Sequence, residues 1–322
     1  MSRGSKRNRE VSGASSRAAR DLAVSAGLLF VLALSGCGSV SGVAVAPPID
    51  IMILTTDRET TDQVLRRLQG VERMPATQTA TEGVSRGTLA GATDGSVYSI
   101  LVGRVARQDD ATMRGIMKHA VERWRPRYML VLGTALAVAN EAPLGAVGIV
   151  TMSCEFDLDQ FEESRDMGNC YRPDGGLRAA ALSLREQWEA SSRDDPLRAD
   201  CSPARVMKLA ALCGESDPGP RYVEVAAGLS ENIHRGLIFE RDGIFAAEAV
   251  EDLRHEGRAP IGFLMIRGVS DVRGPGMGRE EARETGKTQL HRVQKACAAR
   301  DAADFATALI RYRWPVSSRS ER

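Results

Sequence analysis

Runs of apolar residues alternate with segments of helical periodicity along most of the chain. The apolar runs predict buried strands at 49–56, 97–103, 127–135, 145–152, 234–239 and 261–271. The periodic segments predict helices at 57–70, 109–124, 176–191, 246–257 and 288–314. Strands that are apolar on both faces and alternate with helices are typical of a sheet covered by helices. We therefore predict an α/β fold in which a central mixed, twisted sheet lies between helical layers, a three-layer α/β/α arrangement.

Three stretches interrupt this alternation. The threonine- and glycine-rich stretch between the first helix and the second strand predicts a hairpin. Residues 157–174 are polar and irregular, which predicts a long loop. A proline-rich segment follows the helix at 176–191, and within it residues 203–213 predict a short helix.

The N-terminal residues have the composition of an export signal. Basic residues precede an uncharged apolar stretch at 22–34, which is shorter than the ~20 residues of a membrane-spanning helix. The stretch runs into the residues Leu-Ser-Gly-Cys at 34–37, which resemble the lipobox of bacterial lipoproteins. That resemblance implies that the signal, 1–36, is removed and that Cys37 carries a lipid. The lipid would anchor the chain to a membrane of the bacterial cell envelope, facing outside the cytoplasm. An uncleaved anchor and a wrongly assigned start codon are the alternatives.

The rest of the chain divides into a tether, a folded domain and a tail. Residues 37–48 predict a flexible tether because they are rich in glycine, serine and alanine. The folded domain is expected at 49–316, and residues 317–322 are expected to form a disordered tail. With 322 residues, 43% of them hydrophobic, the chain is long enough to bury one large core or two modest ones, and one α/β domain is the simpler interpretation.

Charge and the spacing of metal-binding residue types argue against two classes of function. The formal net charge is +1, from 43 basic and 42 acidic residues, so we expect no nucleic-acid partner. The four histidines are scattered singly and no Cys-x-x-Cys occurs, so we expect neither a metal site nor a cofactor.

Cysteine spacing gives two interpretations of the folded domain. Besides Cys37 the number of cysteines is odd, so at most two disulfides can form there. Local spacing favours Cys154 with Cys170 and Cys201 with Cys213, in a compartment outside the cytoplasm. Buried, unbonded cysteines are an equally good interpretation of the sequence.

Polar residues occur where predicted strands end. In open α/β sheets, ligands bind in the crevice at the carboxyl ends of the strands. Gly133 and Thr134 end one predicted strand, Ser270 and Asp271 end another, and an acid-rich turn follows the first strand. Taken alone, Ser270 and Asp271 are the residues of a common turn or helix cap. Their convergence with the other strand ends predicts a ligand site.

Three ordered segments carry a family resemblance: RYMLVLGTALAVANEAPLGAVGIV, GIFAAEAVEDL and IGFLMIRGVSDV. They resemble a Gly-[Ser/Thr/Ile]-Ala turn after a strand, a Met-Glu-[Ala/Gly] turn that opens a helix, and an Arg-x-[Ile/Val]-Ser-Asp strand end. These blocks are typical of the nucleoside phosphorylase and nucleosidase superfamily. The chain looks most similar to its methylthioadenosine/S-adenosylhomocysteine nucleosidases and related nucleosidase-like domains. The resemblance covers about Ile49 to Trp314, and the 23 residues that separate Glu248 from Asp271 suit the family.

The resemblance implies an N-glycosidase chemistry that depends on two carboxylates. Asp271, positioned by Ser270, would protonate N7 of a leaving purine as a general acid. Glu248 would hold the ribose hydroxyls and place negative charge near the cation that develops at C1′. Gly133 and Thr134 would let the backbone approach the nucleoside closely.

The resemblance also assigns the walls of the base and sugar sites. Phe239 or Phe245 would stack on the base, although an aromatic side chain at a strand end is more often part of the core. Ala247 stands where the family has a methionine that lines the sugar site.

The acid that activates water is the weakest match to the family. Without a gap, Thr60 takes the position of that acid. Glu59 takes this catalytic role only if one residue has been lost from the turn, and Asp57 lies nearby.

An anion site would decide between water and phosphate as the nucleophile. Arg104 and Arg107 lie near a strand end, and arginines are typical phosphate ligands. The glycine-flanked arginine that phosphorylases carry after the first strand is absent, and Arg58 is the only substitute. We therefore expect water to be the nucleophile.

We expect a purine nucleoside N-ribosyl hydrolase with an oxocarbenium-like transition state, on a lipid-anchored exported protein. Its substrate would be a purine nucleoside or an adenosine thioether. The alternatives are a catalytically impaired nucleoside-binding lipoprotein, a phosphate-dependent nucleoside phosphorylase, and an effector domain that acts on a larger nucleotide. By analogy with the family, the chain would form a homodimer in which residues 157–174 complete the pocket of the second copy.

Overall fold

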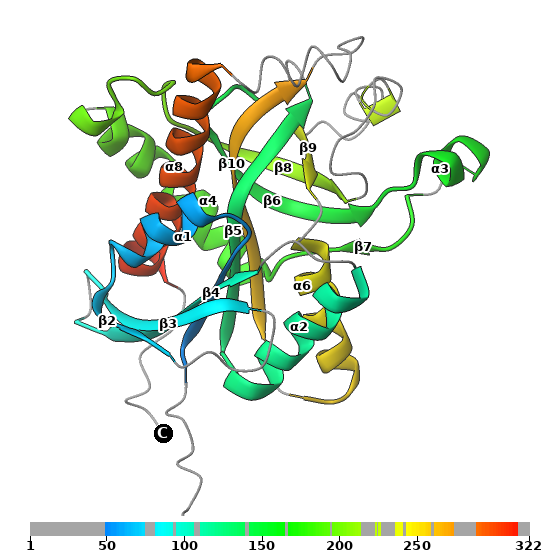
Figure 1. Cartoon of the computed structure of the whole chain (residues 1–322), viewed down its shortest axis with the longest axis horizontal. Coiled ribbons are helices and arrows are strands. Elements are labelled where there is room, and N and C mark those ends of the chain that lie inside the picture. Colours follow the sequence, from blue (N-terminus) through cyan, green and yellow to red (C-terminus); the bar gives the residue numbers. More distant parts are fainter. Residues whose placement is uncertain are drawn as a thin grey trace, which may run out of the picture. The chain divides into compact units, whose positions relative to one another are not determined.

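In the computed structural model, the predicted strands form one mixed β-sheet with helices packed against it (Figure 1). The strands are β1 (Ile51–Thr55), β2 (Gln69–Arg73), β3 (Thr81–Ala90), β4 (Val97–Val105), β5 (Tyr128–Val138), β6 (Ala146–Glu155), β7 (Cys170–Tyr171), β8 (Arg205–Cys213), β9 (Gly236–Glu240) and β10 (Gly262–Arg273). The helices are α1 (Arg58–Leu65), α2 (Asp110–Trp124), α3 (Leu158–Ser164), α4 (Gly175–Arg193), α6 (Gly243–His255), α8 (Gln289–Arg313) and the short 3-10 helix η1 (Pro196–Arg198).

The structure describes residues 49–74, 81–92, 95–105, 110–138, 142–164, 167–193, 195–213, 223, 225–226, 236–240, 243–258, 261–273 and 288–314. These residues belong to one unit, Ala46–Arg322. The predicted signal with its tether (1–48), the lipidation candidate Cys37, Arg107 and the tail (317–322) lie outside them. None of the helices in these ranges has the length and apolar composition that a membrane span requires.

Parallel pairing brings the strands that carry the predicted site together. β1 pairs in parallel with β4 and β5, and β10 pairs in parallel with β5. β3 is antiparallel to both β4 and β2, as the predicted hairpin requires. Five of the strands pair in a ring: β5 with β10, β10 with β6, β6 with β8, β8 with β9, and β9 with β5. The prediction of an α/β fold with a mixed sheet is confirmed.

Alternate residues of the central strands face two apolar clusters, because successive side chains of a strand point to opposite faces. In β1, Met52 and Leu54 belong to one cluster, and Ile51 and Ile53 belong to the other. The first cluster includes the apolar residues of α2 and α6, and the second includes those of α1, α4 and α8. Figure 1 shows α2 beside α6 on one side of these strands, and α1 and α8 on the other.

Two segments differ from the sequence-based expectation. The helix predicted within 203–213 is wrong, because Arg205–Cys213 forms β8 and pairs in parallel with both β6 and β9. Backbone pairing on both edges and burial of its last five residues outweigh the helical propensity of its alanines and leucines. The predicted loop at 157–174 contains α3, whose Phe161 is buried, and β7.

Two disulfides occur in the described part of the chain, Cys154–Cys170 and Cys201–Cys297. The first is the predicted pair, whereas the predicted pairing of Cys201 with Cys213 is wrong. Cys213 is the buried last residue of β8, and its sulfur lies 3.1 Å from Ser153 Oγ. Helix α8 brings Cys297 to Cys201 across 96 residues, a partner that local spacing does not indicate.

Candidate functional site

The predicted site residues of β5 and β10 lie side by side, because the two strands are parallel and in register. Gly268 pairs with Thr134, and Asp271 pairs with Leu136. The predicted strand ends at Thr134 and Asp271 are wrong, since β5 continues to Val138 and β10 to Arg273. The site residues therefore project from paired strands, which hold them more rigidly than loops would.

Gly133 lies where three polar groups approach the backbone. A Cβ atom at this position would lie 2.1 Å from Thr56 Oγ1, 2.9 Å from Arg267 Nη1 and 3.4 Å from Asp57 Oδ2. Only glycine leaves room for this arrangement. Thr134 donates its backbone N–H to Asp57 Oδ2 at 3.3 Å. The Gly133–Thr134 segment thus faces a carboxylate and a guanidinium.

Asp57 supplies the carboxylate beside Gly133. It is the N-cap of α1, where its Oδ1 accepts the backbone N–H of Thr60 at 2.7 Å and its Oδ2 accepts the Thr60 hydroxyl at 2.9 Å. Thr60 is buried, whereas Glu59 is exposed in the first turn of α1. Of the two acids considered from the sequence, the structure brings Asp57 to the edge of the sheet and directs Glu59 to solvent.

Arg267 is a site residue to which sequence reasoning gave no role. Its side chain has 0% exposure and forms an ion pair with Glu240 of β9, which also accepts the backbone N–H of Gly243 at the start of α6. Arg267 Nε and Nη1 form no hydrogen bond among the described residues, and Nη1 points at Gly133. The signal in the sequence was a charged residue inside an otherwise apolar strand, since arginine is almost never fully buried without a partner.

Ser270 and Asp271 lie at a β-bulge. Val269 pairs with Ala135 and Asp271 pairs with Leu136, so that Ser270 is the extra residue of β10. Ser270 is buried, and its hydroxyl donates to the Ala135 carbonyl at 3.4 Å. Asp271 is half-buried, and its Oδ1 accepts the backbone N–H of Val272 at 2.9 Å. The bulge rotates Asp271 relative to the regular alternation of the strand.

Glu248 lies on α6 and is held by two side chains from other elements. Arg114 of α2 donates to Glu248 Oε2 at 2.6 Å and to Oε1 at 3.1 Å, and the Tyr171 hydroxyl of β7 lies 3.5 Å from Oε1. Burial, together with the Glu248 carboxylate, raises the pKa of Tyr171 to about 12. Asp271 and Glu248 are joined by no hydrogen bond or ion pair in the described structure.

The other predicted binding residues are part of the apolar core. Phe239 of β9 pairs with Leu136, which is also the partner of Asp271, so Phe239 and Asp271 flank β5 at the same level. Phe245 and Ala247 are buried in α6, and the guanidinium of Arg114 lies 5.4 Å from the Phe245 ring centre. The side chain at Phe239 is therefore the better placed of the two aromatics for contact with a base near Asp271.

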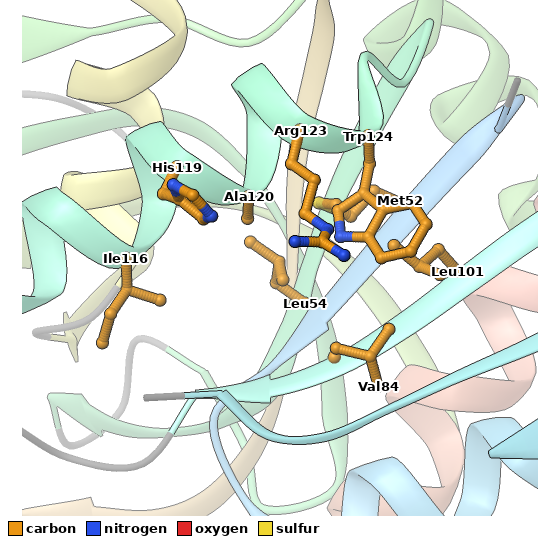
Figure 2. Close-up of a pocket in the computed structure, with 10 residues that line it drawn as sticks. Met52, Leu54, Val84, Leu101, Ile116, His119, Ala120, Arg123 and Trp124 are labelled. Carbon is orange, nitrogen blue, oxygen red and sulfur yellow. The ribbon is translucent and has the colours of Figure 1, made fainter. Parts of the chain in front are cut away.

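A narrow hollow, with a cavity volume of only about 10 Å³, lies between α2 and the strands β1, β3 and β4. Figure 2 shows Ile116, Ala120 and Trp124 of α2 around it, facing Leu54 and Val84. Among the described residues that line it, His119 and Arg123 alone are charged or titratable, and none is a predicted site residue. We interpret it as the packing gap between helix and sheet.

A larger hollow, with a cavity volume of about 360 Å³, lies beside the first turn of α1. Arg58, Arg73 and Arg104 line it, together with polar residues of α1 and β3. Arg104 pairs with Thr55 at the carboxyl end of β1, so this hollow adjoins the edge at which Asp57 lies. Two of the arginines considered as phosphate ligands thus share one hollow.

The arrangement provides groups that can donate or accept protons and hydrogen bonds at separate points. Asp271 can donate a proton at one level of β10, and Asp57 can accept one beside Gly133. Arg267 offers donors that are directed at the same point as Asp57, and Glu248 offers acceptors on α6. No cluster of metal-ligating side chains occurs in the ranges that the structure describes.

Similarity to known proteins is confined to the fold. No protein-family model matches the chain, and no curated protein does. The 5′-methylthioadenosine/S-adenosylhomocysteine nucleosidase from Neisseria meningitidis, solved with methylthio-immucillin-A, matches with a TM-score of 0.59 at 14% identity. The match covers 81% of this chain and 98% of that one.

Two further solved structures agree with this match. The corresponding nucleosidase from Colwellia psychrerythraea, in complex with adenine, has a TM-score of 0.58 at 15% identity, over 82% of this chain and 95% of that one. Futalosine hydrolase of Helicobacter pylori has a TM-score of 0.55 at 13% identity, over 81% of this chain and 97% of that one. The predicted likeness is therefore confirmed at the level of the fold, which the chain shares with these solved nucleosidases and with futalosine hydrolase.

Proposed function

We propose that the chain hydrolyses the N-glycosidic bond of a purine nucleoside. The observation that carries the proposal is the register of β10 on β5, which sets Asp271 beside the strand whose Gly133 faces Asp57 and Arg267. The nucleosidases of the same fold support it, since two of them were solved with adenine or a nucleoside analogue.

At the base, Asp271 acts as the general acid. Proton transfer from its carboxyl to N7 of the purine makes the base a neutral leaving group, and the bond from C1′ to the base breaks with its electrons going to the base. The bulge at Ser270 sets the direction of Asp271, and Phe239 at the same level of β5 provides an apolar surface for the ring.

At the sugar, Glu248 accepts hydrogen bonds from the ribose hydroxyls. A carboxylate has about four acceptor positions, and Arg114 and Tyr171 use only some of them. Glu248 therefore has capacity for hydroxyl donors without losing its arginine. Its negative charge stabilises the oxocarbenium character that develops at C1′.

At the opposite face of the sugar, we place the attacking water beside Gly133. Asp57 accepts the proton that water loses as its oxygen bonds to C1′, and Arg267 Nη1 donates a hydrogen bond that orients the water. Glu59, the acid expected from the sequence, is exposed in the adjoining turn, so the geometry favours Asp57 for this role.

Phosphorolysis is the second candidate reaction. The hollow lined by Arg58, Arg73 and Arg104 adjoins the carboxyl end of β1, and three guanidinium groups suit a phosphate dianion. Phosphate would then replace water as the nucleophile at C1′.

We also propose that Cys37 carries a lipid and anchors the domain outside the cytoplasm. The two disulfides support this placement, because disulfides persist mainly in oxidising compartments. Cys37→Ala is expected to move the protein out of the membrane fraction, and an unchanged distribution contradicts the anchor.

Base release from purified residues 38–322 tests the reaction. The substrates are adenosine, inosine, methylthioadenosine and S-adenosylhomocysteine, each with and without phosphate. Loss of the acid in Asp271→Asn should lower kcat at least ~100-fold, the usual contribution of a general acid. Asp200→Asn, in the exposed turn after η1, is the matched control. Binding without release indicates the impaired binding protein, and release that requires phosphate indicates the phosphorylase.

A further inference from the structure

The disulfide Cys154–Cys170 lies beside the residues that hold Glu248. Glu155 directly follows Cys154, and its Oε1 lies 3.6 Å from Arg114 Nη2. Tyr171 directly follows Cys170, and its hydroxyl lies 3.5 Å from Glu248 Oε1. The residue after each bridged cysteine therefore contacts one member of the Arg114–Glu248 pair.

The bridge compensates for a weak strand pairing. β7 contains only Cys170 and Tyr171, which pair with Cys154 and Ser153 of β6. The loop between the bridged cysteines includes α3. Next to the disulfide, a backbone hydrogen bond also joins the two ends of the loop, from the Glu155 N–H to the Asn169 carbonyl at 2.9 Å. A cross-link removes the entropy of closing such a loop, so it keeps a two-residue strand in register.

We propose that the Cys154–Cys170 disulfide fixes Tyr171 as a positioning residue for Glu248, and that the ribose affinity of the site depends on it. The inference rests on the proposed function of Glu248. Arg114 fixes the plane of the carboxylate through two hydrogen bonds, and the Tyr171 hydroxyl occupies one further acceptor direction on Oε1. The acceptor directions that remain are then defined for the ribose hydroxyls.

The second disulfide provides a matched control for the test. Cys201–Cys297 attaches α8 to the segment before β8, and neither cysteine nor its neighbour in the chain contacts Glu248. Cys154→Ser/Cys170→Ser should raise KM for the nucleoside about tenfold and change kcat less than about twofold, because the lost interaction is with the bound substrate. Cys201→Ser/Cys297→Ser should leave KM unchanged.

A tyrosine variant separates positioning from general loosening of the loop. Tyr171→Phe should raise KM about threefold, as expected for one long hydrogen bond to a charged group. Combined with the Cys154→Ser/Cys170→Ser variant, it should add almost nothing, since the cysteine variant has already lost the Tyr171 hydrogen bond together with the order of its strand. Fully additive effects, or an unchanged KM in the folded cysteine variant, overturn the proposal.

A measurement without substrate keeps the inference separate from the proposed reaction. In protein with ¹³C-labelled tyrosine rings, the Tyr171 resonance is assigned from Tyr171→Phe. It should shift in Cys154→Ser/Cys170→Ser and stay in place in Cys201→Ser/Cys297→Ser. An unshifted Tyr171 resonance in the first variant overturns the positioning role even if no nucleoside is cleaved. If the cysteine variant shows the shift but the wild-type protein neither binds nor cleaves nucleosides, the ribose role is overturned, and with it the proposed function.

Discussion

Two arginine–carboxylate pairs in this protein differ in what surrounds them. The Arg267 and Glu240 side chains are 0% and 4% exposed, and the pair joins β10 to β9 inside the sheet. The Arg114 and Glu248 side chains are 52% and 13% exposed, and the pair joins α2 to α6. Removal of one partner from the first pair leaves a charge without water, whereas the second pair reaches water through its half-exposed arginine. The buried pair can therefore support the fold, and the exposed pair can adapt to a ligand.

The largest effect is expected from the buried pair. Glu240→Gln removes the counter-charge of Arg267 but retains an acceptor for the Gly243 backbone N–H. The free energy of unfolding should fall by about 3–5 kcal/mol, the usual cost of an uncompensated buried charge. Urea unfolding measures the loss, and a change below about 1 kcal/mol would refute the structural role of the pair.

A second substitution separates the structural and chemical roles of Arg267. Adding Arg267→Met to Glu240→Gln removes the buried charge, so most of the lost stability should return. Base release should stay low in this double variant, because the donor beside Gly133 is gone. Recovery of both stability and activity would show that Arg267 has no part in the reaction.

A third pair extends the comparison to pH. Asp301 of α8 lies 2.5 Å from Arg198 Nη1, and both side chains are buried. Burial raises the pKa of Asp301 to about 6, against the opposite effect of Arg198 and Arg300. Because this pKa is raised on folding, protonated Asp301 adds to the free energy of unfolding. This addition is complete below about pH 4 and is lost as the pH rises to about 6. The loss is roughly 3 kcal/mol.

The effect of Asp301 on stability is measured as the difference between the wild type and a variant without its carboxyl group. The free energies of unfolding of the wild type and Asp301→Asn are compared between pH 4 and pH 7, so that the other carboxyl groups cancel. The wild type should lose stability relative to the variant across this range. A difference that is independent of pH, or of the opposite sign, contradicts the raised pKa.

Much of the fold was predictable because the parallel strands are apolar on both faces. The runs at 127–135 and 261–271 identify β5 and β10, and the glycine and Ser-Asp motifs fall where these strands pair. That β8 is a strand was not predictable in this way. Its alanines and leucines suit a helix, and only pairing with its neighbours β6 and β9 makes it a strand.

The polar partners of the site were less predictable than its strands. Arg114 is 134 residues from Glu248, and no local pattern links them. The choice of Asp57 over Glu59 follows from the N-cap geometry of α1, which the sequence alone places only to within a residue or two. Contacts that depend on side chains from distant elements appear only once the sheet is assembled.

The next largest loss of stability is expected at Gly133, which Arg267 Nη1 faces. Gly133→Ala would bring a methyl group to 2.1 Å from Thr56 Oγ1 and 2.9 Å from Arg267 Nη1. The free energy of unfolding should fall by about 1–3 kcal/mol, and base release should fall with it. Gly115→Ala in α2 is the control, because its Cβ meets nothing within 4 Å and a helical alanine should stabilise by about 0.5–1 kcal/mol. Equal effects of the two substitutions would show that the site around Gly133 can relax.

The smallest effect on stability is expected from the exposed pair. Arg114→Ala removes a half-exposed side chain, so the free energy of unfolding should change by less than about 1 kcal/mol. KM should nevertheless rise, because Glu248 loses the two hydrogen bonds that fix its plane. Unfolding and steady-state kinetics are measured on the same preparation. A stability loss as large as that of Glu240→Gln would mean that the α2–α6 pair also supports the fold, and the distinction between the two pairs would no longer hold.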